Sequence, residues 1–135
     1  MSKIKIAIQK SGRLNEASLK LLKSCGIDIE NGKDQLKVSS SNFPLEVFFL
    51  RNSDIPKYLN NGVVDLAIVG DNLLFETDYQ IDVVRKLGFS KCNVSLAVPK
   101  DLEYTDVSQL NGQRIATSYP KTLQYFLEKN NIKAD

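Results

Sequence analysis

Four short stretches of the sequence place cationic, amide or hydroxyl side chains directly after an apolar run. The first is Gln9-Lys10-Ser11-Gly12-Arg13. Its glycine allows close backbone approach, its two cations add positive charge, and the helix expected after it would present free N–H groups. These residue types favour binding of a phosphate or another anion. The alternative is a solvated turn with two exposed basic residues.

The second stretch follows the apolar run Leu45–Leu50 and begins with Arg51. A guanidinium group that projects from the end of a strand can bind a phosphate or a carboxylate through two parallel hydrogen bonds. The spacing equally allows an ion pair between Arg51 and Asp54. Both interpretations stay open on the sequence alone.

The third and fourth stretches are Gly70-Asp71-Asn72 and Thr117-Ser118-Tyr119. Asp71 suits a ligand contact or a helix cap equally well. In the fourth stretch the hydroxyls can donate to a ligand at a helix start, and Tyr119 can stack on a flat ring. The alternative there is a capping pair beside a packed aromatic side chain.

Composition excludes several kinds of chemistry. The sequence has no histidine, so a Ser-His-Asp triad, a histidine zinc site and a histidine general base are excluded within this chain. The two cysteines, Cys25 and Cys92, have no CxxC spacing and are expected to be buried free thiols. A net charge of +2, with acids and bases mixed, argues against a nucleic-acid partner. The short apolar runs and the absence of a secretory signal indicate a cytoplasmic protein with no membrane partner.

The elements that would position these side chains are short strands alternating with helices, which favours a mostly parallel α/β sheet. Asp28–Asp34 is expected to be a polar turn. The expected strands are Lys3–Gln9, Gln35–Ser39, Leu45–Leu50, Val63–Val69, Asp82–Leu87, Asn93–Val98 and Gln113–Thr117. The expected helices are Leu14–Cys25, with Ser11 or Asn15 as cap and Gly26 as stop, then Ile55–Leu59, Leu73–Phe75, Asp106–Leu110 and Tyr119–Asn130. All four polar stretches then lie at carboxyl ends of strands, where α/β sheets bind ligands.

The last residues, Ile132–Asp135, stand where the pattern predicts a further strand. This favours the hypothesis that more chain normally follows. The alternative is a complete domain that ends on a helix.

Several segments together resemble the catalytic subunit of ATP phosphoribosyltransferase, in the same order and over nearly the whole chain. They are Ile6–Leu14, Leu50–Arg51 with Asp54–Pro56, Asn61–Leu66 with Ile68–Asn72, Arg85–Phe89 with Lys91–Cys92, Ser95–Pro99, and Gly112–Pro120. Within the first of these segments, Gln9–Leu14 is more similar to the long, histidine-regulated form than to the short form.

The resemblance implies a periplasmic-binding-protein-like fold, with a mixed, mostly parallel sheet flanked by helices. Residues 1–98 would form most of the first catalytic domain, and residues 99–135 the start of an incomplete second domain. The family transfers the phosphoribosyl group of phosphoribosyl pyrophosphate to N1 of ATP and releases Mg²⁺-bound pyrophosphate, in the first step of histidine biosynthesis. A homo-oligomer, from dimer to hexamer, is expected at full length.

On this resemblance, Arg51 and Lys10 are the expected catalytic residues, and no residue is expected to ligate the metal or to act as a general base. The expected substrate-binding residues are Gln9, Ser11, Gly12, Arg13, Gly70, Asp71, Asn72, Thr117, Ser118 and Tyr119. Two other functions remain as alternatives: a non-catalytic, periplasmic-binding-like ligand-binding module, and an assembly subunit that contributes an interface.

Overall fold

The computed structural model describes residues 2–30 and 34–135. It divides into two compact units, unit 1 over residues 1–91 and unit 2 over residues 92–135. The domain assignment of residues 1–98 and 99–135 stays a prediction. Part of the polar turn expected at Asp28–Asp34 lies outside the described residues.

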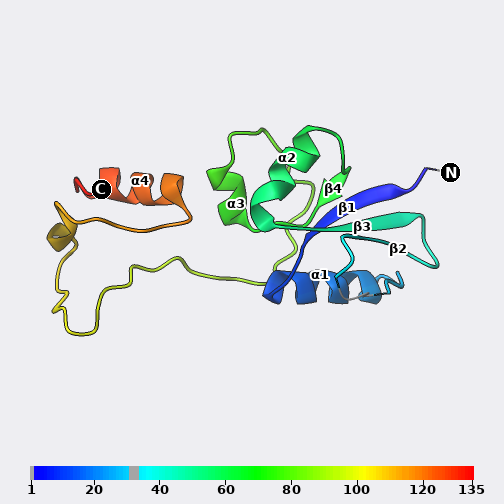
Figure 1. The fold of residues 1–135 in the computed structure, drawn as a ribbon, viewed down its shortest axis with the longest axis horizontal. Coiled ribbons are helices and arrows are strands. Elements are labelled where there is room, and N and C mark those ends of the chain that lie inside the picture. Colours follow the sequence, from blue (N-terminus) through cyan, green and yellow to red (C-terminus); the bar gives the residue numbers. More distant parts are fainter. Residues whose placement is uncertain (1, 31–33) are drawn as a thin grey trace. The chain divides into compact units, whose positions relative to one another are not determined.

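Unit 1 is built on a four-stranded sheet of β1 (Ile4–Gln9), β2 (Lys37–Ser39), β3 (Leu45–Leu50) and β4 (Leu66–Ala67). The strand order is β2-β3-β1-β4 (Figure 1). β1 pairs in parallel with both β3 and β4, and β2 pairs antiparallel with β3. The expectation of a mixed, mostly parallel sheet is therefore confirmed.

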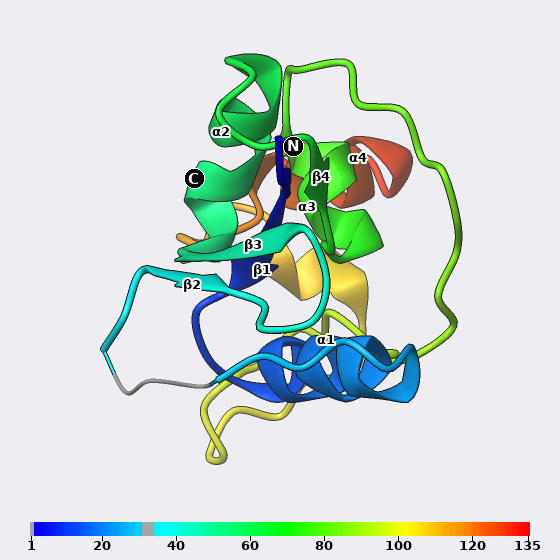
Figure 2. The same cartoon turned by 90° about the vertical axis from the view of Figure 1, so that its right-hand side faces the viewer.

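Helices cover both faces of this sheet. α1 (Arg13–Ser24) lies on one face, and α2 (Ile55–Asn60) and α3 (Asp71–Glu76) lie on the other (Figure 2). The alternation of side chains along β1 explains the two layers. Ile6 and Ile8 pack in one apolar cluster with Leu22 of α1, whereas Ala7, between them, packs in a second cluster with Ile55 and Leu73. Burial of each large apolar side chain stabilises the fold by about 1.5–3 kcal/mol.

α1 ends as the sequence predicts. Gly26 has φ +76°, a left-handed conformation that glycine adopts without steric cost. Its N–H donates to Lys23 O at 2.9 Å, and the N–H of Ile27 donates to Leu22 O at 3.0 Å. These two bonds close the helix in a Schellman motif.

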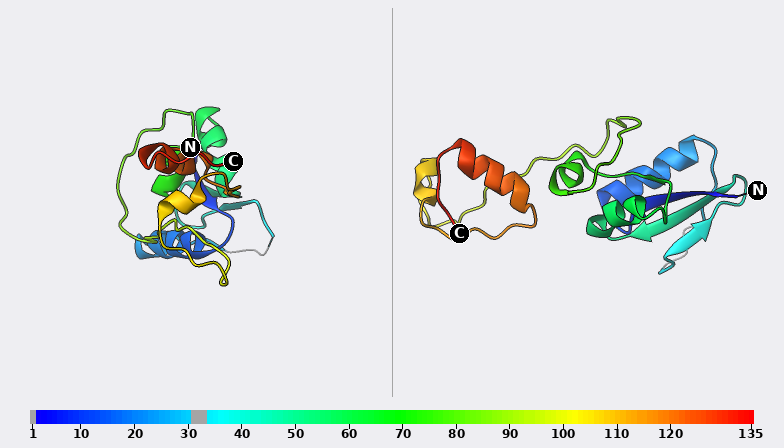
Figure 3. Two further views of the ribbon diagram at one scale, coloured as in Figure 1. Left: turned by 90° about the vertical axis from the view of Figure 1, so that its left-hand side faces the viewer. Right: turned by 90° about the horizontal axis from the view of Figure 1, so that it is seen from above.

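Unit 2 contains the 3₁₀ turn η2 (Val107–Leu110) and helix α4 (Pro120–Lys129), coloured yellow to red in Figure 3. No strand is assigned at Gln113–Thr117, but three backbone hydrogen bonds join this segment to the last residues. The N–H groups of Gly112, Asp135 and Ile115 donate to the carbonyls of Lys133, Gln113 and Asp135, at 2.8, 2.8 and 2.6 Å. This pattern of hydrogen bonds is that of two neighbouring parallel strands, so α4 connects two extended segments that lie side by side.

Three expected strands are absent from the described part of the chain, which are Gln113–Thr117 and two segments that precede it. Asp82–Leu87 and Asn93–Val98 have no regular secondary structure, and Val84 is 84% exposed. Their apolar, β-branched sequence is compatible with a strand, but a strand also needs a hydrogen-bonded neighbour, and none pairs with them here.

The expectation that both cysteines are buried is wrong, because Cys25 and Cys92 are exposed. Cys25 is the residue at which α1 ends, and Cys92 lies in the extended segment after Lys91, so neither faces a core. Over the residues that the structure describes, no helix combines the length and the apolar character required to span a bilayer.

Candidate anion-binding site at the carboxyl edge of the sheet

Three of the four polar stretches meet at one edge of unit 1. β3, β1 and β4 are neighbours and run parallel, so their carboxyl ends share that edge. The N–H of Lys10 donates to Leu50 O at 2.8 Å, which sets the first turn beside the second. Ala7 pairs with Ala67, and Lys10 and Gly70 each lie three residues further along. Since neighbouring strands are about 4.8 Å apart, the three turns together span about 10 Å.

Gly12 shapes the first turn. Its backbone has φ +88° and ψ −169°, a conformation that only glycine adopts readily. Gly12 is the N-cap of α1, and no side chain of the described residues caps this helix, so the expected cap by Ser11 or Asn15 is wrong. Asn15 instead donates its amide to Gln9 O at 2.9 Å. The first N–H groups of α1 are therefore left without a side-chain acceptor, as an anion site requires.

The cations of the first two turns are available to a ligand. Lys10, Arg13 and Arg51 are exposed, and no ion pair to any of them forms among residues 2–30 and 34–135. The alternative that Arg51 pairs with Asp54 is therefore not realised. Three uncompensated positive charges on adjacent turns favour a polyanionic ligand.

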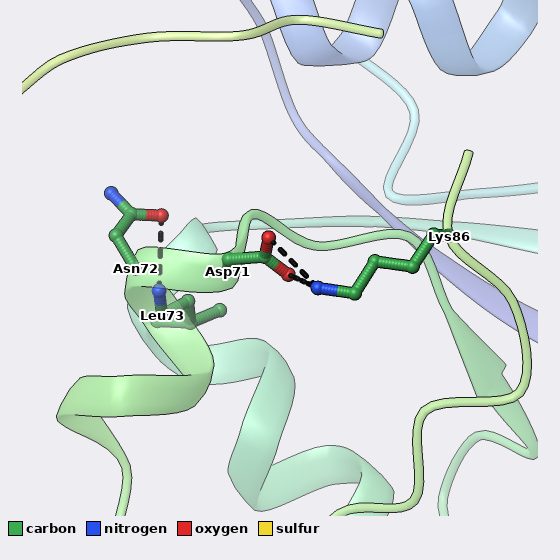
Figure 4. Close-up of polar contacts among 4 residues, drawn as sticks. All are labelled: Asp71, Asn72, Leu73 and Lys86. Atoms are coloured by element: carbon green, nitrogen blue, oxygen red, sulfur yellow. Dashed lines mark hydrogen bonds and ion pairs between the residues drawn. The ribbon is translucent and has the colours of Figure 1, made fainter. Parts of the chain in front are cut away.

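The third turn carries a carboxylate with a partner. Gly70, not Asp71, is the N-cap of α3, and within residues 2–30 and 34–135 no side chain caps this helix, so the cap interpretation of Asp71 is wrong. The Asp71 carboxylate accepts two hydrogen bonds from Lys86 Nζ, at 3.2 and 3.3 Å (Figure 4). Asn72 Oδ1 accepts the N–H of Leu73 at 3.0 Å. A Cβ on Gly70 would lie 2.5 Å from that oxygen, so the glycine leaves room for the amide.

One polar atom beside Arg51 lacks a partner. Asn52 Oδ1 is buried and accepts no hydrogen bond within the described residues. Such an acceptor costs free energy unless a donor reaches it. The second turn therefore contains a hydrogen-bond acceptor that lacks a donor. Asn52 was not among the site residues expected from the sequence.

The fourth stretch lies in unit 2. Thr117 Oγ1 accepts the N–H of Tyr119 at 2.8 Å, just before Pro120 opens α4. Thr117 and Tyr119 line a cavity of about 880 Å³ within this unit, together with apolar side chains that include Leu96, Ile115 and Phe126. Ser118 is exposed. The participation of Thr117, Ser118 and Tyr119 in one site with the three turns of unit 1 stays a prediction.

Two contacts at this edge were not predicted from the sequence. Lys86 lies fifteen residues after Asp71, in a segment without regular structure, so no local pattern indicated that the two side chains meet. The bond from Asn15 to Gln9 O spans six residues across a turn. An asparagine in the first turn of a helix could have indicated it, because that amide competes for nearby backbone groups.

Comparison with known proteins gives a consistent result. A family model described as ATP phosphoribosyltransferase (HisG) matches residues 51–135. An ATP phosphoribosyltransferase from Cytophaga hutchinsonii is 56% identical over 131 residues, which are 97% of this chain and 46% of that protein. One from Bacteroides thetaiotaomicron is 49% identical over 132 residues, 98% of this chain and 47% of that protein. The chain thus spans about half the length of the curated relatives it matches.

The fold also matches a solved structure. A chain of the ATP phosphoribosyl transferase (HisG:HisZ) complex from Thermotoga maritima superposes with a TM-score of 0.62 at 24% identity, over 97% of this chain and 61% of that chain. This likeness confirms the expected fold class, a periplasmic-binding-protein-like arrangement with helices flanking a mostly parallel sheet.

Proposed function

Because the chain belongs to the ATP phosphoribosyltransferase family, we propose that it contributes to transfer of the phosphoribosyl group from phosphoribosyl pyrophosphate to N1 of ATP. Pyrophosphate is released, and the reaction is the first step of histidine biosynthesis. The observation that carries this proposal is the carboxyl edge of the sheet, where Lys10, Arg13 and Arg51 have no ion-pair partner among the described residues. Both substrates carry polyphosphate groups that such an edge would bind.

The reaction needs little general acid or general base catalysis. N1 of the adenine ring attacks the anomeric carbon of the ribose, a carbon–nitrogen bond forms, and the carbon–oxygen bond to pyrophosphate breaks with its electron pair. Negative charge develops on the leaving oxygen. We assign Arg51 and Lys10 to the stabilisation of that charge, with Arg13 in a lesser role. Gly12 and Gly70 would let the backbone approach the substrate closely.

Mg²⁺ is proposed to arrive with the substrates. Over the part of the chain that the structure describes, no group of three or more Cys, Asp or Glu side chains could hold a metal ion. Polyphosphate oxygens are hard ligands that suit Mg²⁺. The cations of this chain would then bind the metal–polyphosphate complex from its outer side.

Further parts of the proposal rest on the family alone. Thr117, Ser118 and Tyr119 would form the wall of the substrate cleft contributed by the second domain, with the division between domains after residue 98. The protein at its natural length would be a cytoplasmic homo-oligomer, from dimer to hexamer, and would be of the long, histidine-regulated form.

Substitution of Arg51 by alanine tests the assignment of the edge. We expect the affinity for ATP or for phosphoribosyl pyrophosphate to fall at least tenfold, about 1.4 kcal/mol, in calorimetric titrations of the protein at its natural length. Lys57→Ala is the matched control, because it removes an equivalent charge from an exposed position on α2. Unchanged affinity and turnover in Arg51→Ala would remove Arg51 from the site.

A further inference from the structure

The ion pair between Asp71 and Lys86 is much more exposed than a contact that stabilises a fold. Both carboxylate oxygens accept from the same Nζ, at 3.2 and 3.3 Å, and each side chain is 75% exposed (Figure 4). An ion pair this exposed contributes little to folding stability, because water screens it and two long side chains lose freedom. Its consequence for the local charge is therefore larger than its consequence for the fold.

That local charge matters because of where Asp71 lies. The turn that carries it is the third of the three at the carboxyl edge, and the turn nearest to it along the sheet carries Lys10 and Arg13. Those cations have no acidic partner in residues 2–30 and 34–135, whereas Asp71 does have a basic one. The edge thus leaves cations uncompensated while it neutralises a carboxylate that would oppose a polyanion.

Lys86 comes from a part of the chain with no other evident role at this edge. It lies in a segment that has no regular secondary structure and that keeps Val83 and Val84 exposed. Three residues further on, Phe89 packs against the apolar cluster on the α1 face of the sheet. This contact anchors the segment close to Lys86 and limits how far its ammonium group can move from Asp71.

We propose that Lys86 is a positioning residue of the substrate site, which holds the Asp71 carboxylate and cancels its charge so that this carboxylate does not repel a polyphosphate bound by Lys10, Arg13 and Arg51. This inference rests on the proposed function and extends it to a residue outside the three turns. Lys86 acts through Asp71. Its removal exposes one negative charge within about a Debye length of the polyphosphate, which should raise KM roughly three- to tenfold and leave kcat nearly unchanged.

The test compares four forms of the protein at its natural length: wild type, Lys86→Ala, Asp71→Asn and the double variant. KM and kcat are measured for ATP and for phosphoribosyl pyrophosphate at low and at high salt. Lys86→Arg should retain the wild-type KM, since it keeps the charge. Lys91→Ala is the matched control, because Lys91 is exposed on the same segment and forms no ion pair among the described residues.

The expected result is that Lys86→Ala has a higher KM than wild type. This difference in KM should be smaller at high salt, and Lys86→Ala should cause no rise in KM in the Asp71→Asn background. An unchanged KM in Lys86→Ala would overturn the inference. So would an equal rise in the Asp71→Asn background, since Lys86 would then act independently of Asp71. If wild type itself forms no phosphoribosyl-ATP, the proposed function fails, which is a different outcome from wild-type turnover with an inert Lys86.

Discussion

Replacement of Gly12 by alanine tests whether the first turn requires a backbone conformation that only glycine adopts readily, independently of the contacts that a side chain would make there. The backbone at this position has φ +88° and ψ −169°, which alanine adopts only under strain. A Cβ there would meet Gln9 Nε2 at 3.8 Å, an ordinary van der Waals distance, so no clash adds to the strain. The entire effect should therefore come from the backbone.

The magnitude follows from two opposing terms. A non-glycine residue in this region costs of the order of 1–3 kcal/mol. Alanine also restricts the unfolded chain, which offsets about 0.4–1 kcal/mol of that cost. We therefore expect Gly12→Ala to lower the free energy of unfolding by about 1–2 kcal/mol.

The second glycine of the edge provides the control. Gly70 has φ −78° and ψ 151°, which any residue adopts, so alanine adds no backbone strain there. Among the described residues, an added Cβ would displace the amide of Asn72 from the N–H of Leu73, at the cost of about one hydrogen bond. Gly70→Ala should therefore change the free energy of unfolding by less than about 1 kcal/mol. Urea denaturation followed by circular dichroism measures both variants. If Gly12→Ala proved as stable as Gly70→Ala, the first turn would not hold the conformation described here, and the account of α1 as an uncapped, open helix start would lose its basis.

Two further predictions concern polar contacts. Asn15→Ala removes the 2.9 Å bond to Gln9 O and should lower the free energy of unfolding by about 1 kcal/mol, measured by the same denaturation; no change would mean that water replaces the amide at no cost. The pKa of Asp106 lies below its usual value, chiefly because the Ser108 hydroxyl donates to its carboxylate, so Ser108→Ala should raise that pKa in an NMR titration. Because the folded-state pKa is depressed, the associated stabilisation is present above the unfolded pKa and is lost as pH falls through the folded one, and Ser108→Ala should reduce that acid-dependent loss.

The fold of unit 1 could be predicted from the sequence because its signals are local. The apolar residues of Lys3–Gln9 and the β-rich run Leu45–Leu50 predict two strands, and Gly26 predicts the end of α1. Each of these patterns reports a steric or burial preference of the residues themselves. The order β2-β3-β1-β4 then brings three of the polar stretches to one edge.

The errors have a common cause, which is that strand formation and burial depend on partners remote in sequence. Among the residues that the structure describes, Asp82–Leu87 has strand-forming residues but no neighbouring strand, and Cys92 is exposed rather than packed in a core. The cap assignments failed for a related reason. Gly12 and Gly70 occupy the N-cap positions, so Ser11 and Asn15, the expected caps of α1, and Asp71, for which a cap was one interpretation, have other environments.

The candidate site could be predicted only in part, because some of its contacts also depend on partners remote in sequence. Residue type and position after a strand predicted that Lys10 and Arg51 lie at the carboxyl edge of the sheet, and their roles in a site stay a prediction. The sequence left open whether Arg51 pairs with Asp54, and it gave no indication that Lys86 contacts Asp71, since both questions depend on three-dimensional distances.

The central claim is tested most directly by mixing the protein at its natural length with ATP, phosphoribosyl pyrophosphate and Mg²⁺, and following pyrophosphate release together with the mass of the nucleotide product. The account predicts equimolar pyrophosphate and phosphoribosyl-ATP, with turnover strongly reduced in Arg51→Ala. Binding of both substrates without any product would contradict it and would favour a ligand-binding module instead.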